Sequence, residues 1–155
     1  MEQTLVLIKP DGIQRGLVGE IITRFERKGI RIRGFKMMRV TKEFAAEHYA
    51  VHKDKDFYNK LIDFITSGPL CAMVLSCPDV IRLVRNMIGA TCPIDAAPGT
   101  IRGDYASVTN KNLVHSSDSP ENAESEIALW FKHDEILQWE SALSTWFGKP
   151  PSEAE

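Results

Sequence analysis

Short apolar runs alternate along this chain with segments whose apolar residues recur at helical spacing. Two of these runs, residues 4–8 and 70–75, are typical of buried strands. Between them, Val18, Ile21 and Phe25 mark one face of a helix. Strands separated by helices predict an α/β or α+β sandwich, and connectivity alone leaves open whether the sheet is parallel or antiparallel.

The remaining elements are bounded by residues that begin or end helices and strands. Further helices are expected from Thr41, as the cap, to Tyr49, around residues 61–65, over residues 80–88 with Asp79 as the cap, and from residues 119–120 onward. Strands are expected over residues 30–40, with a bend or bulge at Gly34, and at residues 113–114. Loops or turns are expected at residues 9–12, 89–99 and 101–105.

The composition is that of an ordinary soluble globular protein, with 43% hydrophobic and 26% charged residues among 155. We expect one domain over residues 1–155, with a flexible tail at 149–155. A net charge of −2 disfavours binding to nucleic acid. Because no apolar run is long enough to span a membrane and the N-terminus lacks a signal-peptide pattern, we expect a cytoplasmic protein without a membrane partner.

The cysteine and histidine spacings do not favour a disulfide framework or a zinc site. The chain has an odd number of cysteines, Cys71, Cys77 and Cys92, and their spacing gives no C-x-x-C pair. His48 and His52 lie four apart on an expected helix, and we interpret them as part of a partly exposed helical face.

His115 follows the apolar pair 113–114 and precedes a run of small polar residues. A strand that ends here would present the imidazole at the edge of a cleft. A neutral imidazole can attack phosphorus without an activating base. Glu126 falls at the edge of the apolar stripe of the following helix, where a buried carboxylate needs a partner. An N–H of His115 is one candidate partner, and a surface lysine is the alternative.

Attack on a terminal phosphate also needs cations around the phosphate oxygens. Lys9 at the end of the first strand, Arg85 on a helix and Arg102 after the glycine-containing loop are candidates. Taken singly, each is more simply a surface charge. The chain lacks the Walker pattern and the protein kinase motifs, so phosphoryl transfer would need another arrangement, such as a covalent intermediate on histidine.

Several separated motifs resemble those of nucleoside diphosphate kinases in order and spacing. They are Lys9-Pro10-Asp11-Gly12, Gln14-Arg15-Gly16, Ser67-Gly68-Pro69, residues 98–104 and residues 112–118. This likeness covers nearly the whole chain and implies a ferredoxin-like sandwich of the α/β (α+β) type, with a four-stranded antiparallel sheet and covering helices. It also implies a phosphotransferase that passes the γ-phosphate of a nucleoside triphosphate to a nucleoside diphosphate, in a ping-pong reaction through phosphohistidine at His115.

The same resemblance implies roles for individual residues. Catalytic roles fall on His115, Glu126, Lys9 and Ser117, with Glu126 orienting His115 and Ser117 supporting that contact. Substrate contacts fall on Lys9, Arg85, Thr91 and Arg102 for the phosphates, Lys9 and Asn112 for the sugar, and Tyr49, Phe57, Leu61 and Thr109 around the pocket, with Phe57 stacking on the base. Asp118 would reach Mg²⁺ through water, because the cofactor Mg²⁺ would be bound mainly by the nucleotide phosphates.

Three positions depart from the family pattern. Ser116 stands where glycine is usual, Cys92 where asparagine is usual, and Thr109 where an apolar residue is usual beside the base. These changes affect local backbone geometry and loop contacts. They leave the expected nucleophile and its charged neighbours intact.

The expected partners are nucleoside di- and triphosphates and other copies of the chain. The resemblance implies a hexamer or a tetramer, of which the hexamer is favoured, with Pro93 in a loop associated with subunit contacts. Trp146 and Phe147 fit either a subunit contact or core packing. Two rival functions are a non-catalytic oligomeric or nucleic-acid-binding protein on the same fold, and transfer of phosphate from His115 to another protein.

Overall fold

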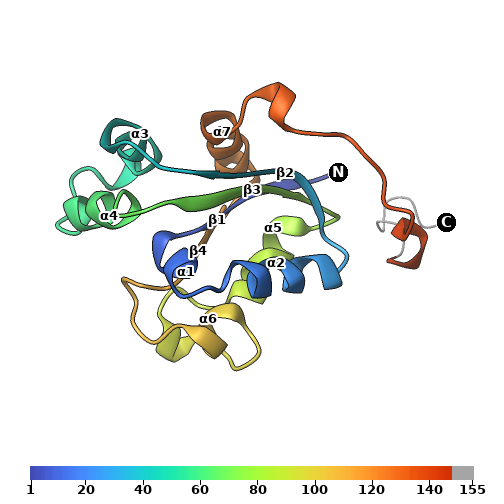
Figure 1. Cartoon of the computed structure of the whole chain (residues 1–155), viewed down its shortest axis with the longest axis horizontal. Coiled ribbons are helices and arrows are strands. Elements are labelled where there is room, and N and C mark those ends of the chain that lie inside the picture. The colour runs from blue at the N-terminus through green and yellow to red at the C-terminus, as the bar shows by residue number, and fades with distance from the viewer. Residues whose placement is uncertain (148–155) are drawn as a thin grey trace.

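The computed structural model of the protein describes residues 1–147, and its four strands form one sheet in the order β2-β3-β1-β4 (Figure 1). The strands are β1 (Gln3–Ile8), β2 (Arg31–Met38), β3 (Leu70–Ser76) and β4 (Val114–Ser116). Every neighbouring pair is antiparallel, so the strand direction that local patterning left open is settled in favour of the ferredoxin-like expectation. The tail expected at residues 149–155 lies outside the described residues.

Helices cover both faces of this sheet (Figure 1). One face carries α2 (Val18–Arg27), α5 (Val80–Ile88) and α6 (Ile101–Tyr105), and the other carries α3 (Lys42–His48), α4 (Tyr58–Ile65) and α7 (Pro120–Trp130). A short helix, α1 (Pro10–Gln14), directly follows β1, and single 3-10 turns occupy Ala50–His52, Pro93–Asp95, His133–Glu135 and Ser144–Trp146. Among residues 1–147, no helix has the length and apolar character needed to cross a membrane.

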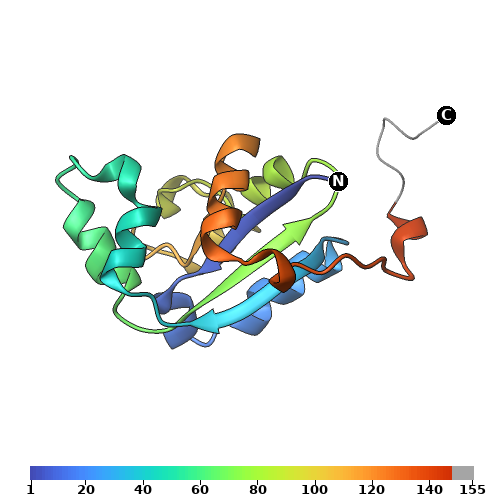
Figure 2. The ribbon, with the colours of Figure 1, turned by 90° about the horizontal axis from the view of Figure 1, so that it is seen from above.

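The two central strands read as continuous apolar runs because both of their faces are buried. Val6 and Ile8 point into the core beneath α2 and α5, and Leu5 and Leu7 point into the core beneath α3, α4 and α7. All residues of β3 are likewise buried. Figure 2 shows α7 lying across β1, which places this helix over the sheet next to β4.

Several local expectations are confirmed. The hydroxyl of Thr41 accepts a hydrogen bond from the N–H of Phe44 and so caps α3. The pairing of β2 with β3 shifts register between Ile32 and Gly34, which is the irregularity expected at the glycine. A Cβ added to Gly34 would lie 2.9 Å from the ring of Phe131, so the close approach of this ring also requires glycine.

Other local expectations were wrong. The segments expected as a polar loop and a turn are the one-turn helices α1 and α6, begun by Pro10 and by the cap Thr100. Asp79 is the N-cap residue of α5, as expected, but its φ is 52° and its side chain accepts no hydrogen bond from the first turn. The N–H of Ile81 instead donates to the carboxylate of Glu2 at 3.0 Å.

At the C-terminal end of the described chain, the expectation that Trp146 and Phe147 pack in the core is also wrong. The exposed fractions of Trp146 and Phe147 are 82% and 54%.

Candidate active site

His115 is the middle residue of β4, the short strand at one edge of the sheet, rather than the residue after a strand end. Its neighbour Val114 packs into the core beneath α2 and α5. Because side chains alternate along a strand, His115 points to the opposite face, where α7 lies. The register, in which His115 pairs with Leu7, agrees with this orientation.

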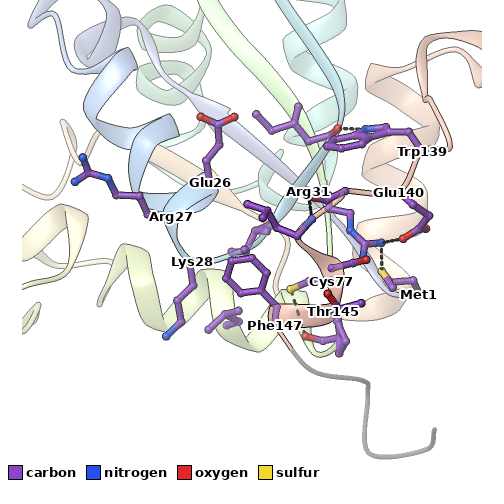
Figure 3. A pocket seen from close by; sticks show the side chains of 18 residues that line it. Met1, Glu26, Arg27, Lys28, Arg31, Cys77, Trp139, Glu140, Thr145 and Phe147 are labelled. Atoms are coloured by element: carbon purple, nitrogen blue, oxygen red, sulfur yellow. Dashed lines mark hydrogen bonds and ion pairs between the residues drawn. The ribbon is translucent and has the colours of Figure 1, made fainter.

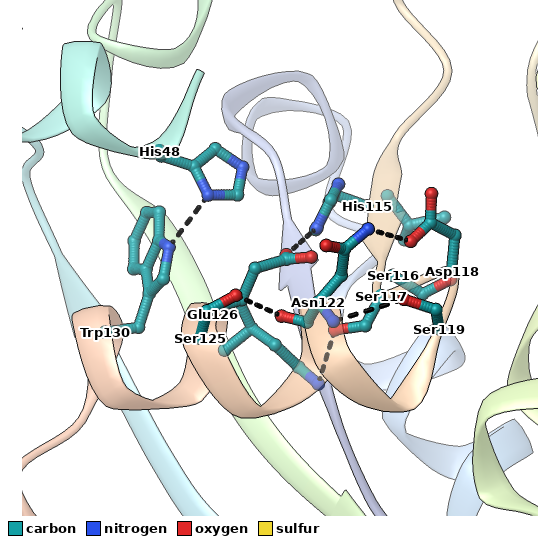
Figure 4. Close-up of polar contacts among 12 residues, drawn as sticks. His48, His115, Ser116, Ser117, Asp118, Ser119, Asn122, Ser125, Glu126 and Trp130 are labelled. Carbon is teal, nitrogen blue, oxygen red and sulfur yellow. Dashed lines mark hydrogen bonds and ion pairs between the residues drawn. The ribbon is translucent and has the colours of Figure 1, made fainter. Parts of the chain in front are cut away.

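Glu126 extends from α7 to His115, and its Oε2 contacts Nε2 of the imidazole (Figure 4). The exposed fraction is 27% for the side chain of His115 and 17% for that of Glu126, so this contact is largely shielded from water. A carboxylate accepts a hydrogen bond from an N–H group. The neutral imidazole of His115 therefore carries its hydrogen on Nε2 and its lone pair on Nδ1. Within residues 1–147, Nδ1 of His115 makes no hydrogen bond and is free to attack an electrophile.

A second histidine, His48 at the end of α3, packs edge-to-face against His115 with ring centroids 4.9 Å apart. The indole N–H of Trp130 donates to Nδ1 of His48 at 3.1 Å (Figure 4). Burial lowers the pKa of His48 to about 3, and the charges of His115, His52 and Lys9 act in the same direction. His48 is therefore neutral at pH 7, with its hydrogen on Nε2.

The interpretation of His48 and His52 as one helical face was wrong, although both side chains are partly exposed, as expected. The helix α3 ends at His48, and His52 lies in the following 3-10 turn. His48 faces the site instead of solvent.

Ligand atoms of His48, His115 and Glu126 lie within 4.8 Å of one another, which is close enough to consider a metal ion. Metal binding through Nε2 of His48 would move its hydrogen to Nδ1. That hydrogen would meet the indole N–H of Trp130, a donor facing a donor. The cluster is therefore better described as a hydrogen-bonded group than as a metal site.

Lys9 stands between β1 and α1, and its ammonium group donates to the side-chain oxygen of Asn112. The ammonium also lies 5.6 Å from the ring centroid of Phe64. Burial and the nearby charge of Arg102 lower the pKa of Lys9 to about 8, although Asp11 opposes that shift. Lys9 is thus a half-buried cation that is only moderately basic, which suits a group that meets an anion.

The two arginines have different environments. Arg102 has an exposed fraction of 6%, and its guanidinium donates to the backbone carbonyls of Asn112, Gly89 and Val114. Burial and Arg85 lower the pKa of Arg102 to about 10. Arg85 is exposed on α5 and makes one long hydrogen bond, 3.4 Å, to the carbonyl of Ser116. Arg102 therefore supports the backbone of the site, and Arg85 has the freer guanidinium.

The loop before α6 is tied to the segment before β4. The side-chain amide of Asn112, which is buried, donates to the carbonyl of Thr91 at 3.0 Å. The hydroxyl of Thr109 donates to the thiol of Cys92 at 3.3 Å. Two of the three departures from the family pattern thus contact each other, so each accommodates the other.

Tyr49, Phe57 and Leu61 come from the end of α3 and from α4. Tyr49 is buried, and burial, with the charge of Glu126, raises the pKa of its hydroxyl to about 12. Leu61 is half-buried against the same core, whereas Phe57 is 46% exposed at the start of α4. An exposed aromatic face is available for stacking on a planar ligand.

The residues after His115 have three distinct environments. The buried hydroxyl oxygen of Ser117 accepts a hydrogen bond from the N–H of Leu5 at 3.2 Å. Support by Ser117 of the contact between Glu126 and His115 stays a prediction. The hydroxyl of Ser116 is buried and has no partner within residues 1–147. Asp118 is exposed, and a hydrogen bond from Asn122 lowers the pKa of its carboxyl.

Sequence reasoning missed three residues that contact the site: Asp11, Asn122 and Trp130. A large indole on the apolar stripe of α7 needs a polar partner when buried, and this requirement was a usable signal for Trp130. The partner itself lies on α3, far away in the sequence, so only the fold identifies it.

A groove of about 1110 Å³ lies between the turn after α2, the segment that follows β3 and residues 139–147 (Figure 3). Arg31, Cys77, Trp139 and Phe147 are among the residues that line it. None of the residues predicted to bind substrate lines this groove. Glu126 and His48 instead contact His115 and do not line this groove.

The chain matches known proteins over most of its length. The family model described as "Nucleoside diphosphate kinase" matches residues 2–136. A nucleoside diphosphate kinase of Thermosynechococcus vestitus is 56% identical over 146 residues, which cover 94% of this chain and 97% of that protein. One from Archaeoglobus fulgidus is 53% identical with the same two coverages.

Solved structures agree with these relatives. The structure of a halophilic nucleoside diphosphate kinase from Halobacterium salinarum in complex with CDP superposes with a TM-score of 0.93, at 51% identity and covering 96% of this chain and 99% of that one. A nucleoside diphosphate kinase family protein from Babesia bovis gives a TM-score of 0.92 at 45% identity, with coverages of 96% and 100%. The chain therefore belongs to the nucleoside diphosphate kinase family, phosphotransferases that move phosphate between nucleotides.

Proposed function

We propose that this chain is a nucleoside diphosphate kinase in which His115 carries the phosphate between two nucleotides. The Nδ1 lone pair attacks the γ-phosphorus of a nucleoside triphosphate, the bond from phosphorus to the β-phosphate oxygen breaks, and the diphosphate leaves. A second nucleoside diphosphate then takes the phosphoryl group in the reverse step. The observation that carries this proposal is the contact of Nε2 with Glu126, which leaves Nδ1 free.

Substrate roles follow the chemistry of the surrounding groups. Lys9 and Arg85 bind phosphate oxygens, with Thr91 from the adjacent loop. Arg102 supports this part of the site and adds positive charge. Asn112 and Lys9 meet the sugar, and Phe57 stacks on the base beside Leu61, Thr109 and Tyr49. Ser117 supports the contact between Glu126 and His115.

The residues present fit Mg²⁺ as the cofactor. The carboxyl of Asp118 is exposed beside the proposed phosphate site, and its lowered pKa keeps it ionised at neutral pH. Mg²⁺ keeps several waters and binds proteins through few carboxylates, so Asp118 would hold it through water while nucleotide phosphates supply the other ligands. The bound ion would neutralise charge on the transferring phosphate.

Incubation of the purified protein with Mg²⁺ and γ-labelled ATP tests the proposal. We expect an acid-labile, base-stable label on the protein that is absent from His115→Ala. Addition of an unlabelled nucleoside diphosphate should move this label to the nucleotide. An unlabelled wild-type protein, or a label that persists in His115→Ala, would contradict the mechanism.

The same experiment separates the rival functions. A non-catalytic oligomeric or nucleic-acid-binding protein would take no label at all. If His115 instead supplied another protein, the label would remain on the enzyme after addition of nucleoside diphosphate and would move to an added protein acceptor. We favour the nucleotide acceptor because the aromatic ring of Phe57 is partly exposed and can stack on a nucleotide base.

We further propose that the chain acts in the cytoplasm as one domain over residues 1–155 and assembles into a homo-oligomer, a hexamer rather than a tetramer. The exposed apolar side chains of Ile94, beside Pro93, and of Trp146 support a subunit contact. Light scattering should give six times the chain mass of 17.4 kDa for the hexamer. Four times that mass would indicate the tetramer.

A further inference from the structure

The backbone just before the strand of His115 turns through an unfavourable conformation. Leu113, which is fully buried, has a φ of 75°. The N–H of Val114 donates to the carbonyl of Asn112 at 2.9 Å, so residues 112–114 form a γ-turn of the rare type with positive φ. Such a conformation persists in a bulky residue only when its surroundings enforce it.

Two residues of the segment after β1 hold the peptide groups of Leu113 from both sides. The N–H of Lys9 donates to the carbonyl of Leu113 at 2.8 Å, and the N–H of Leu113 donates to Oδ2 of Asp11 at 3.1 Å. Arg102 holds the carbonyls of the residues on either side of Leu113. Of these partners, only Asp11 satisfies the N–H of the strained residue.

Hydrogen bonds satisfy only one of the two carboxylate oxygens of Asp11 within residues 1–147. The other oxygen of Asp11, Oδ1, is buried and has no hydrogen-bond partner within residues 1–147. A buried carboxylate oxygen without a partner is destabilising. The residue therefore combines a costly environment with one specific contact, to a strained turn at the site.

We propose that Asp11 is a positioning residue for phosphoryl transfer: its carboxylate holds the γ-turn at Leu113 and thereby sets the positions of Asn112 and His115. Asn112 is the first residue of this turn and His115 follows its last residue, so relaxation of φ at Leu113 rotates the two relative to each other. Because attack on phosphorus depends on alignment within a fraction of an ångström, the rate of transfer is more sensitive to this rotation than nucleotide affinity is.

Three substitutions distinguish geometry from charge. Asp11→Asn keeps an oxygen that can accept the N–H of Leu113 and removes the charge, whereas Asp11→Glu keeps the charge and displaces the oxygens by one methylene. Asp11→Ala removes both. Comparison of Asp11→Asn with Asp11→Ala is unaffected by electrostatic effects on Lys9, since both variants lose the same charge.

The measurements are the single-turnover rate of His115 phosphorylation by γ-labelled ATP and the dissociation constant for ADP. We expect the phosphorylation rate of Asp11→Asn to stay within about threefold of wild type, and that of Asp11→Ala and Asp11→Glu to fall on the order of 10- to 100-fold, with a smaller change in ADP affinity. If Asp11→Ala does not fold, the comparison of Asp11→Asn with Asp11→Glu still decides.

Glu2→Ala is the matched control, because Glu2 also accepts a single backbone N–H, that of Ile81, near the opposite end of β1. It should lower the melting temperature and keep the phosphorylation rate within about twofold. Equal rates in the wild type and Asp11→Ala, or a rate in Asp11→Glu that matches or exceeds that of Asp11→Asn, would overturn the inference. The inference rests on the proposed function, and an unlabelled wild-type protein would refute that function instead.

Discussion

At the scale of residues, two histidines in edge-to-face contact are each held in one hydrogen-bonded form by a different residue of α7. Glu126 accepts from Nε2 of His115, and Trp130 donates to Nδ1 of His48. The first imidazole is left with a free lone pair in the site, and the second with an N–H. The two imidazoles therefore differ in role because one partner accepts a hydrogen bond and the other donates one. His115 is left as a nucleophile and His48 as a neutral hydrogen-bond donor.

The lowered pKa of Lys9 predicts an alkaline limit to activity. Lys9 is protonated below about pH 8 and loses its charge above that value, because burial and Arg102 disfavour the ammonium. We expect kcat/KM to fall as the pH rises through about 8, since this parameter reports ionisations of the free enzyme. In Lys9→Arg, whose guanidinium stays charged, the fall should move to higher pH even if the rate is lower. An alkaline limb at the same pH in both proteins would assign it to another group.

The lowered pKa of His48 predicts a loss of stability in acid. The folded protein keeps His48 neutral down to about pH 3, whereas in the unfolded chain this imidazole takes up a proton near the ordinary histidine pKa of 6.5. The unfolded state therefore binds more protons between these values, and the free energy of unfolding falls as the pH drops from about 6.5 towards 3. Urea unfolding at pH 7.5 and pH 4.5 should show a smaller fall for His48→Gln than for wild type. An equal fall in the two proteins would contradict a buried neutral His48.

At the scale of elements, α7 organises the site through residues four apart on one face. Asn122 donates to Asp118, Glu126 contacts His115, and Trp130 donates to His48 (Figure 4). Periodicity alone indicated this helix, its apolar stripe and the position of Glu126 at the stripe's edge. It could not identify the partner of Trp130, because that depends on which element the fold places beside α7.

The start of α7 gives a test of this element. The hydroxyl of Ser119 accepts the N–H of Asn122 at 3.1 Å and caps the helix. Ser119→Ala should lower the free energy of unfolding by about 0.5–2 kcal/mol in urea titrations. Ser125→Ala removes a hydroxyl from the middle of the same helix and should change it by less than about 0.5 kcal/mol. Equal losses in the two variants would show that the cap is not the source.

The short elements show where local patterning stops being informative. The one-turn helices α1 and α6 are too short to carry an apolar stripe, so their turn residues were the only visible signal. The γ-turn at Leu113 depends on Asp11, Lys9 and Arg102, which come from distant parts of the chain. No property of residues 112–114 themselves predicts this γ-turn.

At the scale of the whole molecule, the pattern of strands and helices was readable from the sequence, but their arrangement was not. Buried runs identified β1 and β3, because helices cover both faces of these strands. Antiparallel pairing came from the family resemblance, which supplied long-range information that periodicity lacks, whereas the strand order comes from the structure. The same holds for the site, where residue types suggested a nucleophile and cations, and only the fold brings Lys9, Asn112 and Arg102 together.

The most direct test of the central claim is to find which nitrogen of His115 becomes phosphorylated. The phosphoprotein formed with ATP can be examined by ¹⁵N and ³¹P NMR, which distinguishes phosphate on Nδ1 from phosphate on Nε2. Because Glu126 holds Nε2, we predict that phosphorus is bonded to Nδ1 of His115. Phosphate on Nε2, or on a side chain other than His115, would contradict this account of the site.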